Sequence, residues 1–161
     1  MSKTVGILGG MGPLATVDFF AKIVRNTPAA VDQDHLRIII DNNPQIPPRV
    51  EAILEGAESP LPSMLESVRL LERAGAELIA MPCNTAHYWI KELQEAAKVP
   101  FINMVDTAVA HLARRQGGVS CPTLLLATGA AIRMGLYQKA FAEREMAVQT
   151  LAADEQQLLD A

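Results

Sequence analysis

Apolar residues alternate along the chain between short runs typical of buried strands and longer stretches with helical spacing. The first run covers residues 4–8, and helical spacing follows from Pro13 to about Asn26. Residues 60–75 show the clearest helical pattern, with apolar residues at i, i+3, i+4 and i+7 before a glycine. Strands that alternate with helices in this way predict an α/β fold, a parallel sheet flanked by helices. Further strands are expected at residues 35–40, 77–81, 99–102, 122–127 and 146–151.

The order of these elements predicts one domain followed by the start of another. A strand, a glycine turn, a helix and a second strand occur within residues 5–40, and the same order returns within residues 123–151. We therefore expect a flavodoxin-like α/β domain at residues 1–115 and the beginning of a second, similar domain at residues 116–161. The repeat stops before a counterpart of the third strand, so we expect the chain to be incomplete.

Composition narrows the class of protein. Half of the 161 residues are hydrophobic, which is enough for a substantial core. The net charge of −4, with dispersed Lys and Arg, gives no footprint for a nucleic acid. Two cysteines are too few for a disulfide framework and fit a reducing cytoplasm. The start of the chain is neither a signal peptide nor a membrane span.

The strongest chemical feature is the end of the third predicted strand, where an apolar run passes directly into Cys83, Asn84 and Thr85. A helix is expected at residues 86–97, which would place the thiol at a helix start capped by the amide or the hydroxyl. The positive end of a helix dipole favours a thiolate there. Ligands bind at the carboxyl ends of strands in open α/β sheets, so Cys83 is a candidate catalytic residue. The alternative is an inert packing cysteine, which the adjacent polar pair disfavours.

A glycine turn follows the first strand at residues 9–13, where the backbone can approach a ligand closely. Gly10, Gly12 and Ala15 form a G-x-G-x-x-A pattern, and the acidic Asp41 ends the second strand. That combination is typical of a dinucleotide site. The same turn suits a small carboxylate, because its N–H groups can cradle an anion. The two interpretations stay open at this point, and the absence of a Lys-Ser/Thr pair excludes a phosphate loop.

The loop after the second strand presents Arg49 behind three prolines. An arginine held on such a stiff loop is a candidate bidentate clamp for a carboxylate, although a solvated arginine at a helix start fits the sequence equally well. His87 lies four residues after Cys83, and we expect it to cap a turn or meet an interface rather than act as a base. Histidine spacing predicts no metal site, and Cys121 is expected to be structural.

Three motifs resemble those of the aspartate/glutamate racemase family, with aspartate racemase as the closest branch. They are residues 6–16 (GILGGMGPLAT), 42–49 (NNPQIPPR) and 81–87 (MPCNTAH), and residues 106–108 and 126–138 also match in place. The resemblance covers the whole chain and implies two similar α/β domains with a site between them. It also implies two catalytic cysteines, one per domain, without pyridoxal phosphate or a metal. A homodimer acting on a small amino acid is expected on the same basis.

On this resemblance Cys83 would be one of two thiols that flank the α-carbon, since one base cannot easily serve both faces. Arg49 would hold a carboxylate, and the glycine turn would supply backbone donors near the developing charge. Asn84 and Thr85 would bind the substrate carboxylate or hold the reacting group. The residues implied in substrate binding are Gly10, Met11, Gly12, Gln45, Arg49, Asn84, Thr85 and Thr128.

Two departures from the family pattern bear on activity. The second cysteine, in a Gly-Cys-Thr-Glu-like motif, has no counterpart before Ala161, and Ala131 stands where the family usually has a threonine. We therefore expect the 161-residue chain to racemise poorly, while one thiol still exchanges the α-proton on one face. Two alternatives remain: a carboxylate-binding module that has lost catalysis, and a dinucleotide-dependent enzyme.

Overall fold

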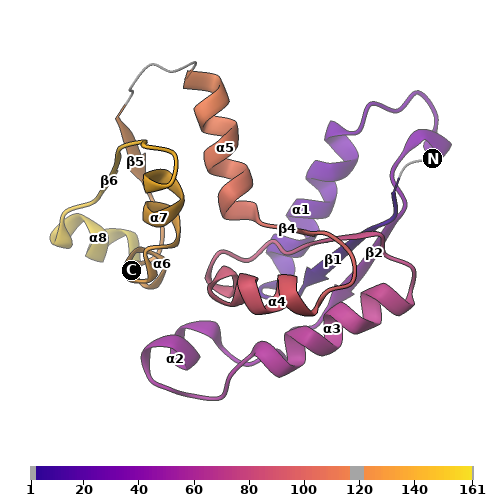
Figure 1. Cartoon of the computed structure of the whole chain (residues 1–161), viewed down its shortest axis with the longest axis horizontal. Coiled ribbons are helices and arrows are strands. Elements are labelled where there is room, and N and C mark those ends of the chain that lie inside the picture. Colours follow the sequence, from indigo (N-terminus) through magenta and orange to yellow (C-terminus); the bar gives the residue numbers. More distant parts are fainter. Residues whose placement is uncertain (1–2, 117–121, 161) are drawn as a thin grey trace. The chain divides into compact units, whose positions relative to one another are not determined.

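The structure is a computed structural model that describes residues 3–116 and 122–160. Contacts divide the chain into two compact units, Met1–Asn103 and Met104–Ala161. Strands and helices alternate through both units, as the sequence predicts (Figure 1). The helix α5 (Met104–Gln116) groups with the second unit, and the domain boundary expected at residue 115 stays a prediction.

The first unit contains a parallel sheet of four strands in the order β2-β1-β3-β4, the order of flavodoxin-like folds. Strand β1 runs from Val5 to Gly9, and all five of its residues are buried because strands flank it on both sides. Its register pairs Leu8 with Asp41 and Gly9 with Asn42, so both strands end at the same edge of the sheet. The other strands are β2 (Ile38–Asn42), β3 (Leu78–Ala80) and β4 (Phe101–Ile102).

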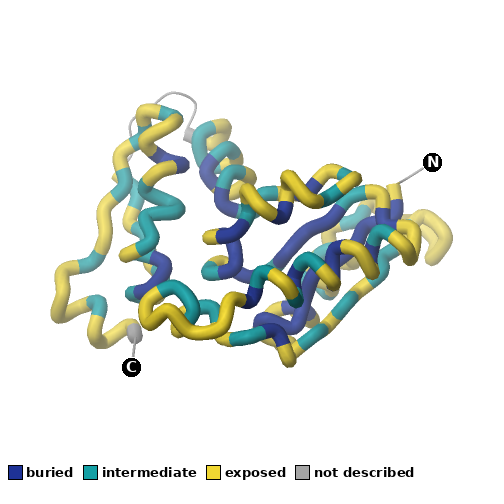
Figure 2. The backbone as a smooth tube through the Cα atoms, turned by 60° about the horizontal axis from the view of Figure 1, so that its bottom comes forward, coloured by how far each residue is buried: buried dark blue, intermediate teal, exposed yellow. Residues whose placement is uncertain are grey.

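Helices cover both faces of this sheet (Figure 1). The helix α1 (Pro13–Asn26) lies on one face, where a side chain at Gly9 would meet Thr16. The helices α3 (Leu61–Arg73) and α4 (Ile90–Ala96) contact each other, and a side chain at Gly6 on the opposite face of β1 would meet Leu71 of α3. Figure 2 shows the buried backbone concentrated along the strands between these layers. The core includes Leu8, Met64, Leu71, Ile79 and Leu93.

The second unit contains a smaller parallel pair formed by β5 (Thr123–Leu125) and β6 (Val148–Thr150). Gly135, with φ +66°, separates the two helices between these strands, because glycine adopts this left-handed conformation at a helix end without steric cost. The strand-helix-strand order of the first unit therefore returns here. The helices are α5 (Met104–Gln116), α6 (Gly129–Met134), α7 (Leu136–Ala142) and α8 (Ala153–Asp160).

Two expectations from the sequence concern the chain as a whole. Within the described ranges, no helix combines the length and the apolar character needed to cross a membrane. Cys121, which we expected to be structural, lies outside the described residues.

Candidate functional site

A pocket of about 470 Å³ opens where β1, β2 and β3 end. One wall comes from the loop after β2 and the start of α2 (Arg49–Leu54), and the other from the segment after β3. We call it the Cys83 pocket. Its lining residues are Met11, Cys83, Thr85 and residues 44–51.

Cys83 lines the wall of this pocket although the residue is only 8% exposed. Strand β3 ends at Ala80, and the buried Met81 anchors the chain that leads to Cys83. Most of the residue is thus shielded from bulk solvent. That placement agrees with a reactive thiol at the carboxyl end of a strand.

The helix expected at residues 86–97 begins differently from the prediction. A 3₁₀-helix, η2 (Thr85–Trp89), comes first, and α4 follows only from Ile90. His87 is buried within this turn, and its Nδ1 donates to the carbonyl of Cys83 at 2.7 Å. The His87 N–H bonds to Asn84 O, three residues back, which is 3₁₀ geometry. The expected α-helix from residue 86 is therefore wrong in its first turns, where a 3₁₀-helix stands, whereas the expected role of His87 in a turn is confirmed. The effect of this helix start on the thiol of Cys83 stays a prediction.

Arg49 is half-buried at the first residue of α2 and lines the Cys83 pocket. Its Nη1 donates to the carbonyls of Ile46 and Pro47 at 3.2 and 3.1 Å. These bonds tie one side of the guanidinium to the proline-rich loop. Its Nε is buried and has no hydrogen-bond partner. A buried donor without an acceptor is costly, and a carboxylate placed against Nε and Nη2 would satisfy it in a bidentate manner.

The glycine turn is closed by Thr16, a residue that the sequence did not single out as part of the site. Its buried Oγ1 accepts the N–H of Gly10 at 2.9 Å and donates to the carbonyl of Gly12 at 3.2 Å. Gly10 has φ +91°, and a side chain there would overlap the backbone of Asn43. The expectation that Gly10 offers its N–H to a ligand is therefore wrong, because that N–H is already bonded. The donor role remains a prediction for Met11 and Gly12.

The structure brings five predicted residues of the first unit together around one pocket. Asn84 is exposed at the start of η2, outside the lining, and its side chain makes no capping bond to the helix. Thr128 belongs to the second unit, where its Oγ1 accepts the N–H of Ala131 and caps α6. Glu51, which sequence analysis missed, lines the pocket two residues after Arg49. The predicted residues that share the pocket are Met11, Gln45, Arg49, Cys83 and Thr85.

The geometry of Asp41 disfavours the dinucleotide interpretation. Its partner in the sheet is Leu8, and its side chain lines a different cavity together with residues of α3. The glycine turn leads instead into α1 on the other face of the sheet. Asp41 and the turn are therefore not placed to bind the same ligand. Within the described residues, no group of three His, Cys, Asp or Glu side chains is placed to hold a metal ion.

Comparison with known proteins identifies the family. The Asp/Glu/hydantoin racemase family matches residues 8–161. The chain belongs to this racemase family. It is 30% identical over 151 residues to the broad specificity amino-acid racemase RacX of Bacillus subtilis, covering 84% of this chain and 59% of that protein.

Solved structures of this family share the fold of the chain. The Picrophilus torridus aspartate racemase is 38% identical with a TM-score of 0.85, and the match covers 98% of this chain and 66% of that one. An aspartate racemase homologue from Pyrococcus horikoshii is 27% identical with a TM-score of 0.81, covering 98% and 68%. The chain thus spans about two thirds, or less, of the length of the relatives it matches.

Proposed function

We propose that this chain carries one half of the site of a cofactor-independent amino-acid racemase that acts on aspartate or glutamate. The observation that supports the proposal most is that Cys83 and Arg49 line the same pocket. A thiol and a carboxylate-binding cation are the two groups that deprotonation next to a carboxylate requires. A cytoplasmic homodimer, expected from the sequence, stays a prediction.

The pocket suggests a division of roles. The guanidinium of Arg49 donates from its Nε edge to the substrate carboxylate. This contact fixes the α-carbon at the strand ends. Glu51, in the first turn of α2, lines the same pocket, and its carboxylate is an acceptor for the α-ammonium group. The thiolate of Cys83 then removes the α-proton and becomes a thiol, leaving the electron pair delocalised into the substrate carboxylate. Met11 and Gly12 offer backbone N–H groups near that developing charge.

Inversion needs a second acid on the opposite face of the α-carbon. The family resemblance assigns that role to a second thiol in a Gly-Cys-Thr-Glu-like motif, and the relatives are longer than this chain. For the 161-residue chain alone we expect proton removal and return on one face. The product then keeps its configuration but gains deuterium in D₂O.

The test is loss of the α-proton signal of aspartate in D₂O, followed by NMR for each enantiomer. Exchange is expected for one enantiomer, and Cys83→Ser should abolish it. The matched control is Cys121→Ser, which should leave exchange intact. Equal exchange in the Cys83→Ser variant would contradict the proposal.

A second candidate, a carboxylate-binding module, is favoured by the unpartnered Nε of Arg49, which needs an acceptor whether or not chemistry follows. Binding of aspartate without exchange of either enantiomer would select this alternative. An Arg49→Lys variant should weaken binding in both cases, since lysine has no bidentate edge.

A further inference from the structure

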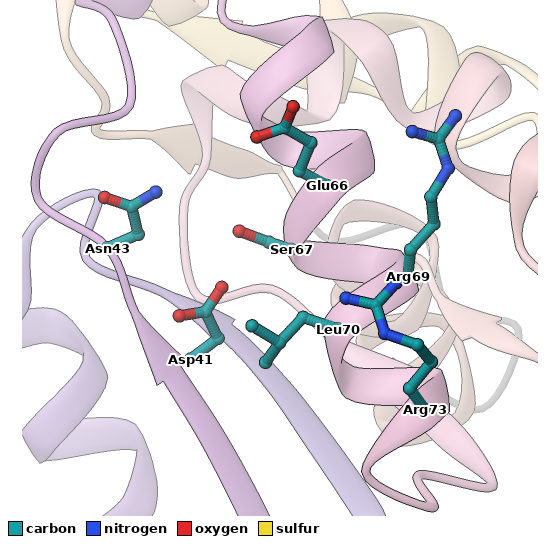
Figure 3. Close-up of a pocket in the computed structure, with 7 residues that line it drawn as sticks. All are labelled: Asp41, Asn43, Glu66, Ser67, Arg69, Leu70 and Arg73. Atoms are coloured by element: carbon teal, nitrogen blue, oxygen red, sulfur yellow. The ribbon is translucent and has the colours of Figure 1, made fainter.

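A second cavity, of about 400 Å³, lies between the end of β2 and the helix α3. It shares no lining residue with the Cys83 pocket, and the proposed racemisation does not use it. We call it the Asp41 pocket. Its lining residues are Asp41, Asn43, Glu66, Ser67, Arg69, Leu70 and Arg73 (Figure 3).

The pocket contains two carboxylates and two guanidiniums that do not neutralise one another. The ion pairs found among the described residues are Lys22–Asp18 and Arg144–Asp106, and neither involves this pocket. Figure 3 shows the Asp41 carboxylate facing α3 from the strand side, while the guanidinium of Arg73 turns inward from the helix. Asp41 therefore stands on the strand wall, while Glu66, Arg69 and Arg73 stand on the helix wall.

Polar and apolar groups complete the lining between these charges. Ser67 is only 3% exposed, and Figure 3 shows its hydroxyl directed toward the side of the cavity that carries Asn43. Leu70 contributes an apolar surface beside Asp41, and 45% of this residue is exposed. A ligand with an ammonium group for the strand wall, a carboxylate for the helix wall and a small apolar side group beside Leu70 matches this arrangement.

We propose that the Asp41 pocket binds a small zwitterion, a free α-amino acid with an uncharged side chain. Its ammonium group is held by Asp41 and its carboxylate by Arg73. The lining is balanced, with two negative and two positive side chains, so a ligand carrying one sign of charge meets repulsion as well as attraction. A zwitterion is attracted at both walls, because each of its charges meets a side chain of opposite charge. The cavity lies within the range of about 300–1,000 Å³ typical of small-ligand sites.

The pocket adjoins the loop that forms the Cys83 pocket. Asn43 lines the Asp41 pocket, its Oδ1 accepts the N–H of Gln45 at 3.0 Å, and Gln45 lines the Cys83 pocket. The two sites are thus separate in their lining but joined through one turn. A titration can still distinguish the two sites, because each pocket has its own lining residues and therefore its own reporter amides.

The test is an NMR titration of the ¹⁵N-labelled 161-residue chain with L-alanine, and separately with acetate and methylammonium. We expect saturable shifts at the amides of Asp41, Ser67 and Leu70 with L-alanine. The half-ligands should bind much more weakly. Asp41→Asn and Arg73→Ala should each weaken binding about tenfold or more, since each removes a charged contact. The matched control is Arg25→Ala, an exposed arginine of α1 outside the pocket, which should change nothing.

Three results would overturn the proposal. One is an absence of shifts at the Asp41-pocket amides, including the case in which only Met11 and Thr85 respond. Another is acetate binding as tightly as L-alanine, which would show a simple anion site. The third is unchanged affinity in both pocket variants. The proposal does not depend on the racemase activity, because Cys83→Ser should leave these shifts intact.

Discussion

The hydroxyl of Thr16 should be worth more to stability than an ordinary helix hydroxyl, because it holds the glycine turn closed. The substitution Thr16→Val keeps the shape of the side chain but removes the acceptor of the Gly10 N–H, a buried bond of 2.9 Å. The Gly12 carbonyl also loses a donor, yet it keeps the N–H of Thr16 at 3.3 Å. One buried donor is therefore left unsatisfied, which costs about 1–3 kcal/mol, or about 5–150-fold in the folding equilibrium.

The matched control lies at the other end of the same helix. Thr27 donates from Oγ1 to the carbonyl of Ile23 at 2.7 Å, and that carbonyl also accepts the Thr27 N–H. Thr27→Val therefore leaves no backbone donor without an acceptor and should change the free energy of unfolding by about 0.5 kcal/mol or less. Urea unfolding followed by Trp89 fluorescence measures both variants, since this single tryptophan is buried in the first-unit core. Equal effects of the two substitutions, or continued protection of the Gly10 amide from hydrogen exchange in Thr16→Val, would refute the reasoning.

Two further predictions concern a glycine and a tyrosine. Gly10→Ala should destabilise the first unit by at least about 1 kcal/mol more than Gly75→Ala. Both glycines have φ near +90°, but only Gly10 faces backbone atoms, those of Asn43. Equal losses of stability in urea unfolding would show that the contact with Asn43 does not matter. Burial raises the pKa of Tyr137 above its ordinary value of 10.0. The folded state therefore holds this proton more tightly than the unfolded state, so the corresponding stability is intact below pH 10 and is lost as the pH rises through the raised pKa. Unfolding followed by circular dichroism should show that decline, and Tyr137→Phe should weaken it; an unchanged pH dependence in Tyr137→Phe would contradict the assignment.

Local signals in the sequence were sufficient for the elements and their order. The helix α1 begins at Pro13 and ends at Asn26 as expected, and Gly135 separates α6 from α7. Strand ends were less accurate. The second strand begins at Ile38 rather than residue 35, because a 3₁₀ turn at Asp32–Asp34 precedes it and His35 closes that turn. Such a turn has no strong periodicity in the sequence.

The candidate site was predicted by residue type but not by its hydrogen bonds. Cys83 and Arg49 were recognisable because each follows a strand, and strands of a parallel sheet end at one edge. The 3₁₀ turn after Cys83 contains a bond from the His87 side chain to the Cys83 carbonyl, and the closed glycine turn contains the bonds of Thr16. Both are side-chain bonds to the backbone, which spacing in the sequence does not predict. The Asp41 pocket joins residues of β2 and α3 that are far apart in the chain.

The central claim is that the thiol of Cys83 and the guanidinium of Arg49 contact the same bound amino acid. The most direct measurement is the rate at which iodoacetamide alkylates Cys83, resolved from Cys121 by peptide mass spectrometry, with and without L-aspartate. We predict that aspartate slows alkylation of Cys83 but not of Cys121, and that Arg49→Lys requires about tenfold or more aspartate for the same protection. Alkylation of Cys83 that is indifferent to aspartate, or equally protected in Arg49→Lys, would contradict the claim.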